Sequence, residues 1–319
     1  MSRNRNQRRL LLAAGVGSAV AFLAVGIEVA PASAIVGGSD TAIEELPWQI
    51  SLQDIDGHIC GGTVIDATHV VTAAHCTEGE TASGLTVVAG VTDLDDSNSQ
   101  RLPVTAIFSH PGYANGEAAD ISILQLGAPL TFGATVSSIA MASEADIDTA
   151  TGAVVSGWGA LGENDDGTTI LQSTPIPLVD DASCEVLMEA AGSGIVPASE
   201  LCAGGDGTDS CYGDSGGPLV VFDAAGVARL AGIVSWGTEC GTATPGAYTE
   251  VPAFTDWMAS VLAGGQAPDE VGPSADDEWI DDEWIDDEWV DDEWVDDEGG
   301  WEVWDETEIN EYYESIWLD

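Results

Sequence analysis

One ten-residue segment holds side chains that could carry out acyl-transfer chemistry. It reads Asp209-Ser-Cys-Tyr-Gly-Asp-Ser-Gly-Gly-Pro218, with Ser215 in a glycine-rich loop and Asp214 directly before it. A serine hydroxyl attacks a carbonyl carbon when a neighbouring base takes its proton. Small polar residues are also ordinary turn formers, so the segment alone is weak evidence. It predicts a nucleophile only if a base and an orienting acid are present elsewhere.

The best candidates for these partners are His75 and Asp120. The chain has only four histidines, and His75 stands where the apolar run Val71-Thr-Ala-Ala meets a cysteine. Asp120 begins a segment of alternating apolar and polar residues that ends at Leu126, a pattern typical of a half-buried strand. Taken singly, the histidine could be a hydrogen-bonded core residue and the aspartate a turn residue. Together with Ser215 they form the set that acyl transfer needs.

The order histidine, aspartate, serine narrows the class further. Subtilisins run Asp, His, Ser and α/β-hydrolases run Ser, Asp, His. The order found here resembles that of the chymotrypsin-fold serine proteases, and the chain is similar to the trypsin-like branch, in particular to secreted trypsins of actinomycetes. Seven motifs in family order carry the resemblance over about residues 35–260: Ile35-Val-Gly-Gly38, Thr72-Ala-Ala-His-Cys76, Asp120-Ile121, Ser156-Gly-Trp-Gly159, Gly213-Asp-Ser-Gly-Gly-Pro218, Ser235-Trp-Gly237 and Pro245-Gly-Ala-Tyr-Thr249.

The resemblance implies a role for each matching residue. Ser215 attacks the peptide carbonyl, His75 takes and later returns the proton, and Asp120 holds the imidazole tautomer. The N–H groups of Gly213 and Ser215 would form the oxyanion hole. The free amine of Ile35 would pair with Asp214 and order the pocket. Because the small-residue run Ala32-Ser-Ala34 directly precedes Ile35, we expect signal peptidase itself to expose this amine. The alternative is an earlier cut that leaves a few propeptide residues.

The resemblance also implies a preference for arginine or lysine before the cleaved bond. Asp209 stands at the base of the primary pocket, where a closed site makes an unpaired carboxylate costly. Ser235 and Gly237 line the wall, and Gly246 leaves room for a long side chain. The other interpretation makes Asp209 a loop cap.

Two residues near the pocket depart from the family pattern. Tyr212 replaces a usual glutamine at the rim, and Glu239 replaces a common glycine at the entrance. A second acid should favour cations, whereas its bulk could narrow the entrance. The basic preference is therefore the firmer expectation, and catalytic efficiency is left open.

Six cysteines indicate either a disulfide framework or a metal site. In an exported chain disulfides are favoured, and six cysteines allow 15 pairings. The sequence has neither a CxxC pair nor a histidine cluster of the kind that would indicate zinc. The family resemblance selects one pairing, Cys60–Cys76, Cys184–Cys202 and Cys211–Cys240. We expect no metal and no cofactor. Calcium stays open because Asp93, Asp95 and Asp96 crowd one loop.

Composition divides the chain into three parts. Residues 1–34 carry four arginines, an apolar run and a small-residue cleavage site, as in a secretory signal peptide; a twin-arginine signal is the alternative. Residues 35–264 suit one peptidase domain. Residues 265–319 contain a linker, four acidic pentapeptides of the type Asp-Asp-Glu-Trp-Ile, 24 acids and no base. Such charge density predicts a disordered acidic tail. Its seven tryptophans leave two uses open, solubility or binding to a cationic surface or partner.

The expected fold of the peptidase domain is all-β. By resemblance it has two antiparallel six-stranded β-barrels followed by a C-terminal helix. Strand-like alternation at Leu85–Ala89, Ile121–Leu126 and Arg229–Ser235 agrees with this. Apolar residues at helical spacing predict the helix over about 251–262, packed on the second barrel.

The net charge of the chain limits the kinds of molecule that the protein is expected to bind. Residues 35–264 contain 31 acids against Arg101 and Arg229, and the whole chain has a formal charge of −50. This acidic balance disfavours nucleic acid as a partner. The signal peptide, with no second apolar stretch after it, predicts a soluble, secreted protein, and we expect a monomer. The family resemblance implies that it acts on protein or peptide substrates with arginine or lysine. Two other classes remain open: a binding protein on an inactive protease scaffold, and an adhesin or assembly protein in which the tail is the functional part.

Overall fold

The structure, a computed structural model of the 319-residue chain, describes residues 35–163, 165, 167–205 and 207–264. The predicted signal peptide at 1–34 and the predicted linker and acidic tail at 265–319 lie outside the described residues. In the part that is described, no helix is long and apolar enough to cross a membrane.

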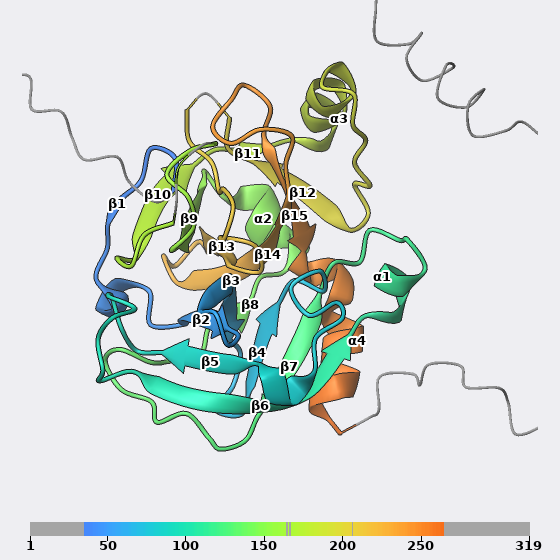
Figure 1. Ribbon diagram of the computed structural model, residues 1–319. Coiled ribbons are helices and arrows are strands. Elements are labelled where there is room, and N and C mark those ends of the chain that lie inside the picture. The colour runs from blue at the N-terminus through green and yellow to red at the C-terminus, as the bar shows by residue number, and fades with distance from the viewer. Residues whose placement is uncertain (1–34, 164, 166, 206, 265–319) are drawn as a thin grey trace, which may run out of the picture. The chain divides into compact units, whose positions relative to one another are not determined.

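The first half of the domain is a closed six-stranded antiparallel barrel, as expected. Its hydrogen-bonded order is β2-β3-β4-β7-β6-β5, and it fills the lower half of Figure 1. Apolar side chains that are at most 1% exposed, such as Leu52, Val87 and Ile123, form its core. The six strands are Gln49–Gln53 (β2), His58–Val64 (β3), His69–Thr72 (β4), Thr86–Ala89 (β5), Gln100–Ser109 (β6) and Ser122–Leu126 (β7).

The second half contains a nine-stranded sheet of order β1-β10-β9-β13-β14-β15-β12-β11, with β8 paired to β14. Six of these strands, β10 to β12 along that path, are the antiparallel set that was expected. The path curls back, because β11 begins two residues after β10 ends. The nine strands are Ser39–Asp40 (β1), Ala140–Met141 (β8), Ala153–Gly157 (β9), Gln172–Ile176 (β10), Leu178–Val179 (β11), Glu200–Ala203 (β12), Pro218–Phe222 (β13), Ala228–Trp236 (β14) and Gly246–Glu250 (β15).

The C-terminal helix forms, but its packing differs in part from the expectation. A 3₁₀ turn, Val251–Phe254 (η3), leads into an α-helix, Thr255–Leu262 (α4). Their buried side chains join the cluster that holds the core of the first barrel, together with three residues of β13 and β14. His110, at the end of β6, contacts the rings of Phe254 and Trp257 edge to face. The helical segment therefore packs on both halves of the domain: η3 contacts β14 of the second sheet, as expected, and its apolar side chains also join the core cluster of the first barrel. In Figure 1, α4 is drawn next to β7.

The remaining helices are short. They are the 3₁₀ turns Ile43–Glu45 (η1) and Ala82–Gly84 (η2) and the α-helices Pro111–Ala114 (α1), Glu144–Thr149 (α2) and Asp181–Ala190 (α3). Asp180 caps α3 by accepting a hydrogen bond from the Ser183 N–H.

Three disulfides tie these elements together. The pairs are the ones that the resemblance implies, Cys60–Cys76, Cys184–Cys202 and Cys211–Cys240. The first fastens β3 to the residue after His75, the second fastens α3 to β12, and the third fastens the Ser215 loop to the segment after β14. Three bridges in one domain are typical of proteins from an oxidising compartment.

Candidate active site

The register between two strands brings His75 to Asp120. Strands β4 and β7 are antiparallel, with Thr72 opposite Ser122. His75 lies three residues beyond that pair on one strand, and Asp120 lies two residues before it on the other. Both residues therefore emerge at the same end of the first barrel, where the chain faces the second sheet.

His75 and Asp120 are joined by two hydrogen bonds, one from the imidazole and one from the backbone. Nδ1 of His75 lies 2.7 Å from Oδ2 of Asp120, and the His75 N–H donates to Oδ1 at 2.9 Å. Ser235 Oγ donates to Oδ2 at 2.6 Å, which links the pair to β14 of the second sheet. Burial alone would raise the pKa of Asp120, but the hydrogen bonds from His75 and Ser235 outweigh it and hold the pKa below its usual range. The carboxylate thus stays ionised and fixes the imidazole.

Ser215 lies in the loop that precedes β13, and this loop contacts both halves of the domain. Its carbonyl accepts a hydrogen bond from the Gly61 N–H of β3 at 2.7 Å, and the next residue, Gly216, donates to Val234 of β14 at 2.8 Å. Among the described residues no hydrogen bond joins Ser215 Oγ to His75. Such bonds are commonly long in unliganded enzymes and tighten when substrate binds.

Two backbone donors in this loop have no acceptor. Among the described residues, the N–H groups of Gly213 and Ser215 make no hydrogen bond, whereas that of Asp214 donates to Cys211. Gly213 has a φ of 94°, a conformation that disfavours any other residue. Two unpaired N–H groups flanking one residue suit the binding of a developing oxyanion.

His58 is a residue that sequence reasoning missed. Its Nε2 lies 2.9 Å from the Gly213 carbonyl oxygen and its Nδ1 lies 2.8 Å from Ser51 Oγ. Burial lowers the pKa of His58, so the ring is neutral at pH 7. With Nε2 protonated, it donates to Gly213 and fixes the orientation of that peptide. The partners are 155 positions apart, and no local pattern signals the contact.

A cavity of about 260 Å³ opens beside Ser215, and Asp209 lines it. Asp209 is 3% exposed, and its Oδ2 accepts a hydrogen bond from the Gly241 N–H at 3.1 Å. Its Oδ1 is buried and has no partner among the described residues. Burial raises the pKa of Asp209 to about 6, although the N–H groups of Gly241 and Ser210 partly oppose this. The carboxylate therefore lacks one partner, which a cationic ligand could supply.

Two glycines leave the cavity open. A Cβ added at Gly246 would lie 2.9 Å from Asp209 Oδ1, and one added at Gly237 would lie 4.0 Å from the Gly246 Cα. A side chain at either position would therefore narrow the approach to the carboxylate. Ser235 also lines this cavity and so connects it to the His75–Asp120 pair.

Glu163, another residue that sequence reasoning missed, binds two residues at the rim of the cavity. Its two oxygens accept hydrogen bonds from Tyr212 Oη at 3.0 Å and from the Cys240 N–H at 3.1 Å. Tyr212 is 62% exposed, and Glu239 also lines the cavity. Glu163 thus holds both sides of the entrance, and the aromatic ring at the rim has a defined partner.

Ile35 and Asp214 are both fully buried. Segment 35–36 lies against the Ser215 loop, since the Val36 N–H donates to the Asp209 carbonyl at 3.1 Å. Asp214 accepts hydrogen bonds from the N–H groups of Gly159 and Cys211, and neither donor is charged. Burial raises the pKa of Asp214 to about 7, and the negative charge of Asp209 adds to this.

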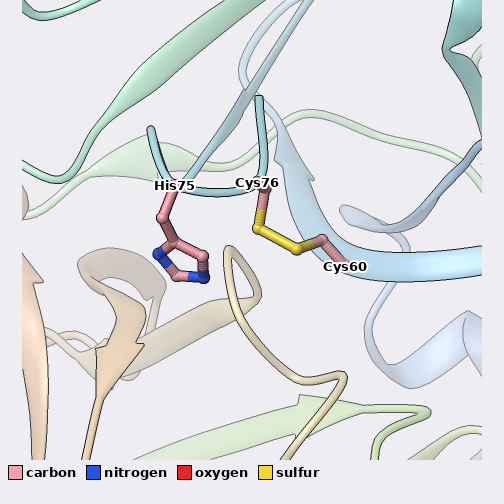
Figure 2. Close-up of side chains that lie close together, drawn as sticks. All are labelled: Cys60, His75 and Cys76. Atoms are coloured by element: carbon pink, nitrogen blue, oxygen red, sulfur yellow. A yellow bond between two sulfur atoms is a disulfide. The ribbon is translucent and has the colours of Figure 1, made fainter. Parts of the chain in front are cut away.

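One cluster of side chains was tested as a possible metal site. Among the described residues, one group of three potential ligands lies close together, Cys60, His75 and Cys76. Figure 2 shows the imidazole beside the two sulfurs, which are bonded to each other. A disulfide offers no thiolate, so the group does not suit zinc. Asp93, Asp95 and Asp96 do not belong to such a group.

Comparisons with known proteins agree with this geometry. The family model described as Trypsin matches residues 35–258. Trypsin-1 of Astacus astacus is 39% identical over 238 residues, which cover 70% of this chain and 98% of the relative. Trypsin delta of Drosophila melanogaster is 39% identical over 229 residues, covering 71% and 87%. Hypodermin-B of Hypoderma lineatum is 40% identical over 227 residues, covering 70% and 86%.

None of these three relatives comes from an actinomycete, so that narrower resemblance stays a prediction. The family model covers well over half of the chain, and the alignments span nearly the whole of each relative. The match ends before the acidic tail, which the trypsin-like region does not include. The chain belongs to the trypsin family of chymotrypsin-fold serine endopeptidases, which hydrolyse protein and peptide substrates.

Proposed function

We propose that this protein is a secreted endopeptidase that cleaves after arginine or lysine through His75, Asp120 and Ser215. The observation that carries the proposal is the placement of a buried, incompletely partnered carboxylate, Asp209, in the cavity that Ser215 lines. Ser235 lines the same cavity and donates to Asp120, which connects the specificity pocket to the imidazole.

In the proposed reaction Ser215 Oγ attacks the carbonyl carbon of the peptide while Nε2 of His75 takes its proton. This nitrogen is available because Nδ1 is hydrogen-bonded to Asp120, which fixes the tautomer. The imidazolium that forms is stabilised by the ionised carboxylate. It then protonates the leaving amine, and water hydrolyses the acyl-enzyme by the reverse sequence.

The proposed oxyanion hole consists of the N–H groups of Gly213 and Ser215. Neither group has an acceptor in the described part of the chain, which supports this, because a donor already engaged would have to break a bond during the reaction. We infer that His58 is a positioning residue for Gly213, since it binds the carbonyl of that residue. Loss of one such donor typically costs about 2.7–4 kcal/mol of transition-state stabilisation.

Activation follows from the burial of Asp214. A buried carboxylate with two neutral donors is poorly stabilised in its charged form. Release of the Ile35 amine by signal peptidase would supply a cation to the site where segment 35–36 already lies against the Ser215 loop. We propose that this pairing orders the pocket and that the enzyme is active when it is secreted.

A serine-directed phosphonate with an arginine side chain tests the catalytic assignment. The secreted protein should incorporate one equivalent at Ser215, and the Ser215→Ala variant should incorporate none. A peptide library should then show cleavage after arginine and lysine. Absence of labelling in the folded, secreted protein would contradict the proposed nucleophile, and cleavage after other residues would contradict the proposed pocket.

A further inference from the structure

A second cavity adjoins the one that Asp209 lines. Its volume is about 530 Å³, within the range of small-ligand sites, and it is lined in part by His75, Tyr113 and Trp236. Ser235 and Trp236 line both cavities, so the two share a wall. A peptide that places one side chain beside Asp209 therefore passes the opening of the second cavity with a neighbouring residue.

The second cavity is acidic. Glu117, Asp120 and Glu200 all line it, and neither lysine nor arginine is among its lining residues. Glu117 is exposed and makes no side-chain hydrogen bond or ion pair with the described residues. Asp120 is engaged with His75 and Ser235. Two glutamates are therefore left to determine which side chains this cavity prefers.

Glu200 is buried in the wall of the cavity. It is 7% exposed, and glutamate is almost never that buried without a partner. Its Oε1 accepts a hydrogen bond from Trp236 Nε1 at 2.8 Å, and its Oε2 accepts one from the Val196 N–H at 2.7 Å. Both donors are neutral, so no cation in the described part of the chain neutralises this carboxylate. The bond to Trp236 also fixes the indole that separates the two cavities.

We propose that the second cavity binds a second arginine or lysine side chain of the same substrate. The enzyme therefore prefers peptides with two basic residues near the cleaved bond. The inference rests on the proposed function and extends it. Glu117 and Glu200 supply the negative charge, and the rings of Trp236 and Tyr113 can contact the cation, an interaction that favours arginine over lysine. An apolar side chain would gain only the aromatic surface and would leave both carboxylates without a cationic partner.

A matched peptide series tests this inference. Fluorogenic peptides with one arginine before the cleaved bond are compared with peptides that carry a second arginine, a citrulline or a leucine at each of the next three positions on either side. At low salt, one position should show kcat/KM higher for arginine than for citrulline by roughly two- to fivefold, as expected of a partly exposed charge pair. The gain should appear in KM and should fall as salt screens the charges.

Three variants, one of them a control outside the cavity, assign the effect to the cavity. Glu117→Gln removes an exposed charge that no side-chain hydrogen bond uses, and Glu44→Gln makes the same change in η1, outside both cavities. Glu117→Gln should reduce the arginine-to-citrulline ratio about two- to threefold, and Glu44→Gln should leave it unchanged. Glu200→Gln should reduce the ratio further. Because Glu200 is buried, its variant is assayed only after its melting temperature shows that it folds.

The outcomes separate this inference from the proposed function. Failure to cleave any peptide after arginine would overturn the proposed function. Normal cleavage after a single arginine, with equal rates for arginine, citrulline and leucine at every other position, would overturn the second basic site alone. Equal effects of Glu117→Gln and Glu44→Gln would also overturn it, since the preference would then follow net charge. A preference for leucine would show an apolar subsite instead.

Discussion

Replacing Asp209 tests the proposed specificity most directly. The Asp209→Ser variant removes the carboxylate from the pocket while leaving the hydrogen bonds of His75 with Asp120 in place. Preference for arginine and lysine should disappear, because the substrate cation would enter a buried site without a partner. Cleavage after small or apolar residues should persist at a low rate, since the proposed triad is unchanged.

The size of the loss follows from the burial of the site. Asp209 is 3% exposed, and one of its oxygens has no partner among the described residues. Removing one partner of a buried ion pair typically costs about 3–5 kcal/mol. At 1.36 kcal/mol for each factor of ten, kcat/KM for arginyl substrates should fall by about 10²- to 10⁴-fold.

The same carboxylate should destabilise the free enzyme. Its pKa in the folded protein is about 6, against an ordinary value of 3.8, so the penalty is absent below about pH 4, grows as the pH rises and is complete above about pH 6. A shift of about two pH units corresponds to about 3 kcal/mol at most. Asp209→Asn keeps an acceptor for the Gly241 N–H and should therefore raise the melting temperature at pH 8 but not at pH 4.

The assay compares wild type, Asp209→Ser and Asp209→Asn on matched arginyl and alanyl substrates, with thermal melts at both pH values. For the wild type, KM for the arginyl substrate should also rise as the pH falls through about 6, because the protonated carboxyl no longer pairs with the cation. A variant that still cleaves after arginine at nearly the wild-type rate would refute the assignment. Equal melting temperatures at pH 8 would refute the electrostatic reasoning while leaving the specificity intact.

Three further predictions concern processing, salt and self-digestion. N-terminal sequencing of freshly secreted enzyme should begin at Ile35, and an inactive form with an earlier start would contradict this. Pairing with Asp214 should raise the pKa of the Ile35 amine above its ordinary value near 8. Activity should therefore fade as the pH rises through that raised pKa. The melting temperature should rise between low salt and about 1 M sodium chloride, because salt screens repulsion among 31 acids in residues 35–264, and a flat or falling curve would contradict it. Self-incubation should leave the domain intact, since its two arginines, Arg101 and Arg229, lie within strands β6 and β14; cleavage at either in the folded enzyme, followed by mass spectrometry, would contradict it.

The sequence predicted the parts of the fold that depend on local pattern. Alternation at Leu85–Ala89, Ile121–Leu126 and Arg229–Ser235 is confirmed by strands β5, β7 and β14. The helical spacing after Val251 is confirmed by η3 and α4. The predicted packing on the second barrel is borne out only in part, by the contact of η3 with β14; the packing on the first barrel was not predicted, because periodicity shows which face is apolar but not which partner covers it.

Residues that act through long-range contacts were beyond sequence reasoning. His58 contacts Gly213 across 155 positions, and Glu200 contacts Trp236 across 36. Glu163 reaches Tyr212 and Cys240 from a loop that carries no motif. In each case the residue type is ordinary, and only the pairing of distant segments shows what the side chain does.

Because the domain has very few basic residues, the buried carboxylates at the site have few cationic partners within the domain. A domain with 31 acids and two arginines has almost no cations with which to pair a buried acid, and Arg229 is already bound to Asp223 at 2.9 Å. Yet Asp209 and Asp214 are buried beside Ser215, each with a raised pKa. Under the proposed function, a substrate side chain pairs with Asp209 and the released amine of Ile35 pairs with Asp214. If the proposed function holds, we expect the cost of burying these acids to couple substrate binding and maturation to the ordering of the site.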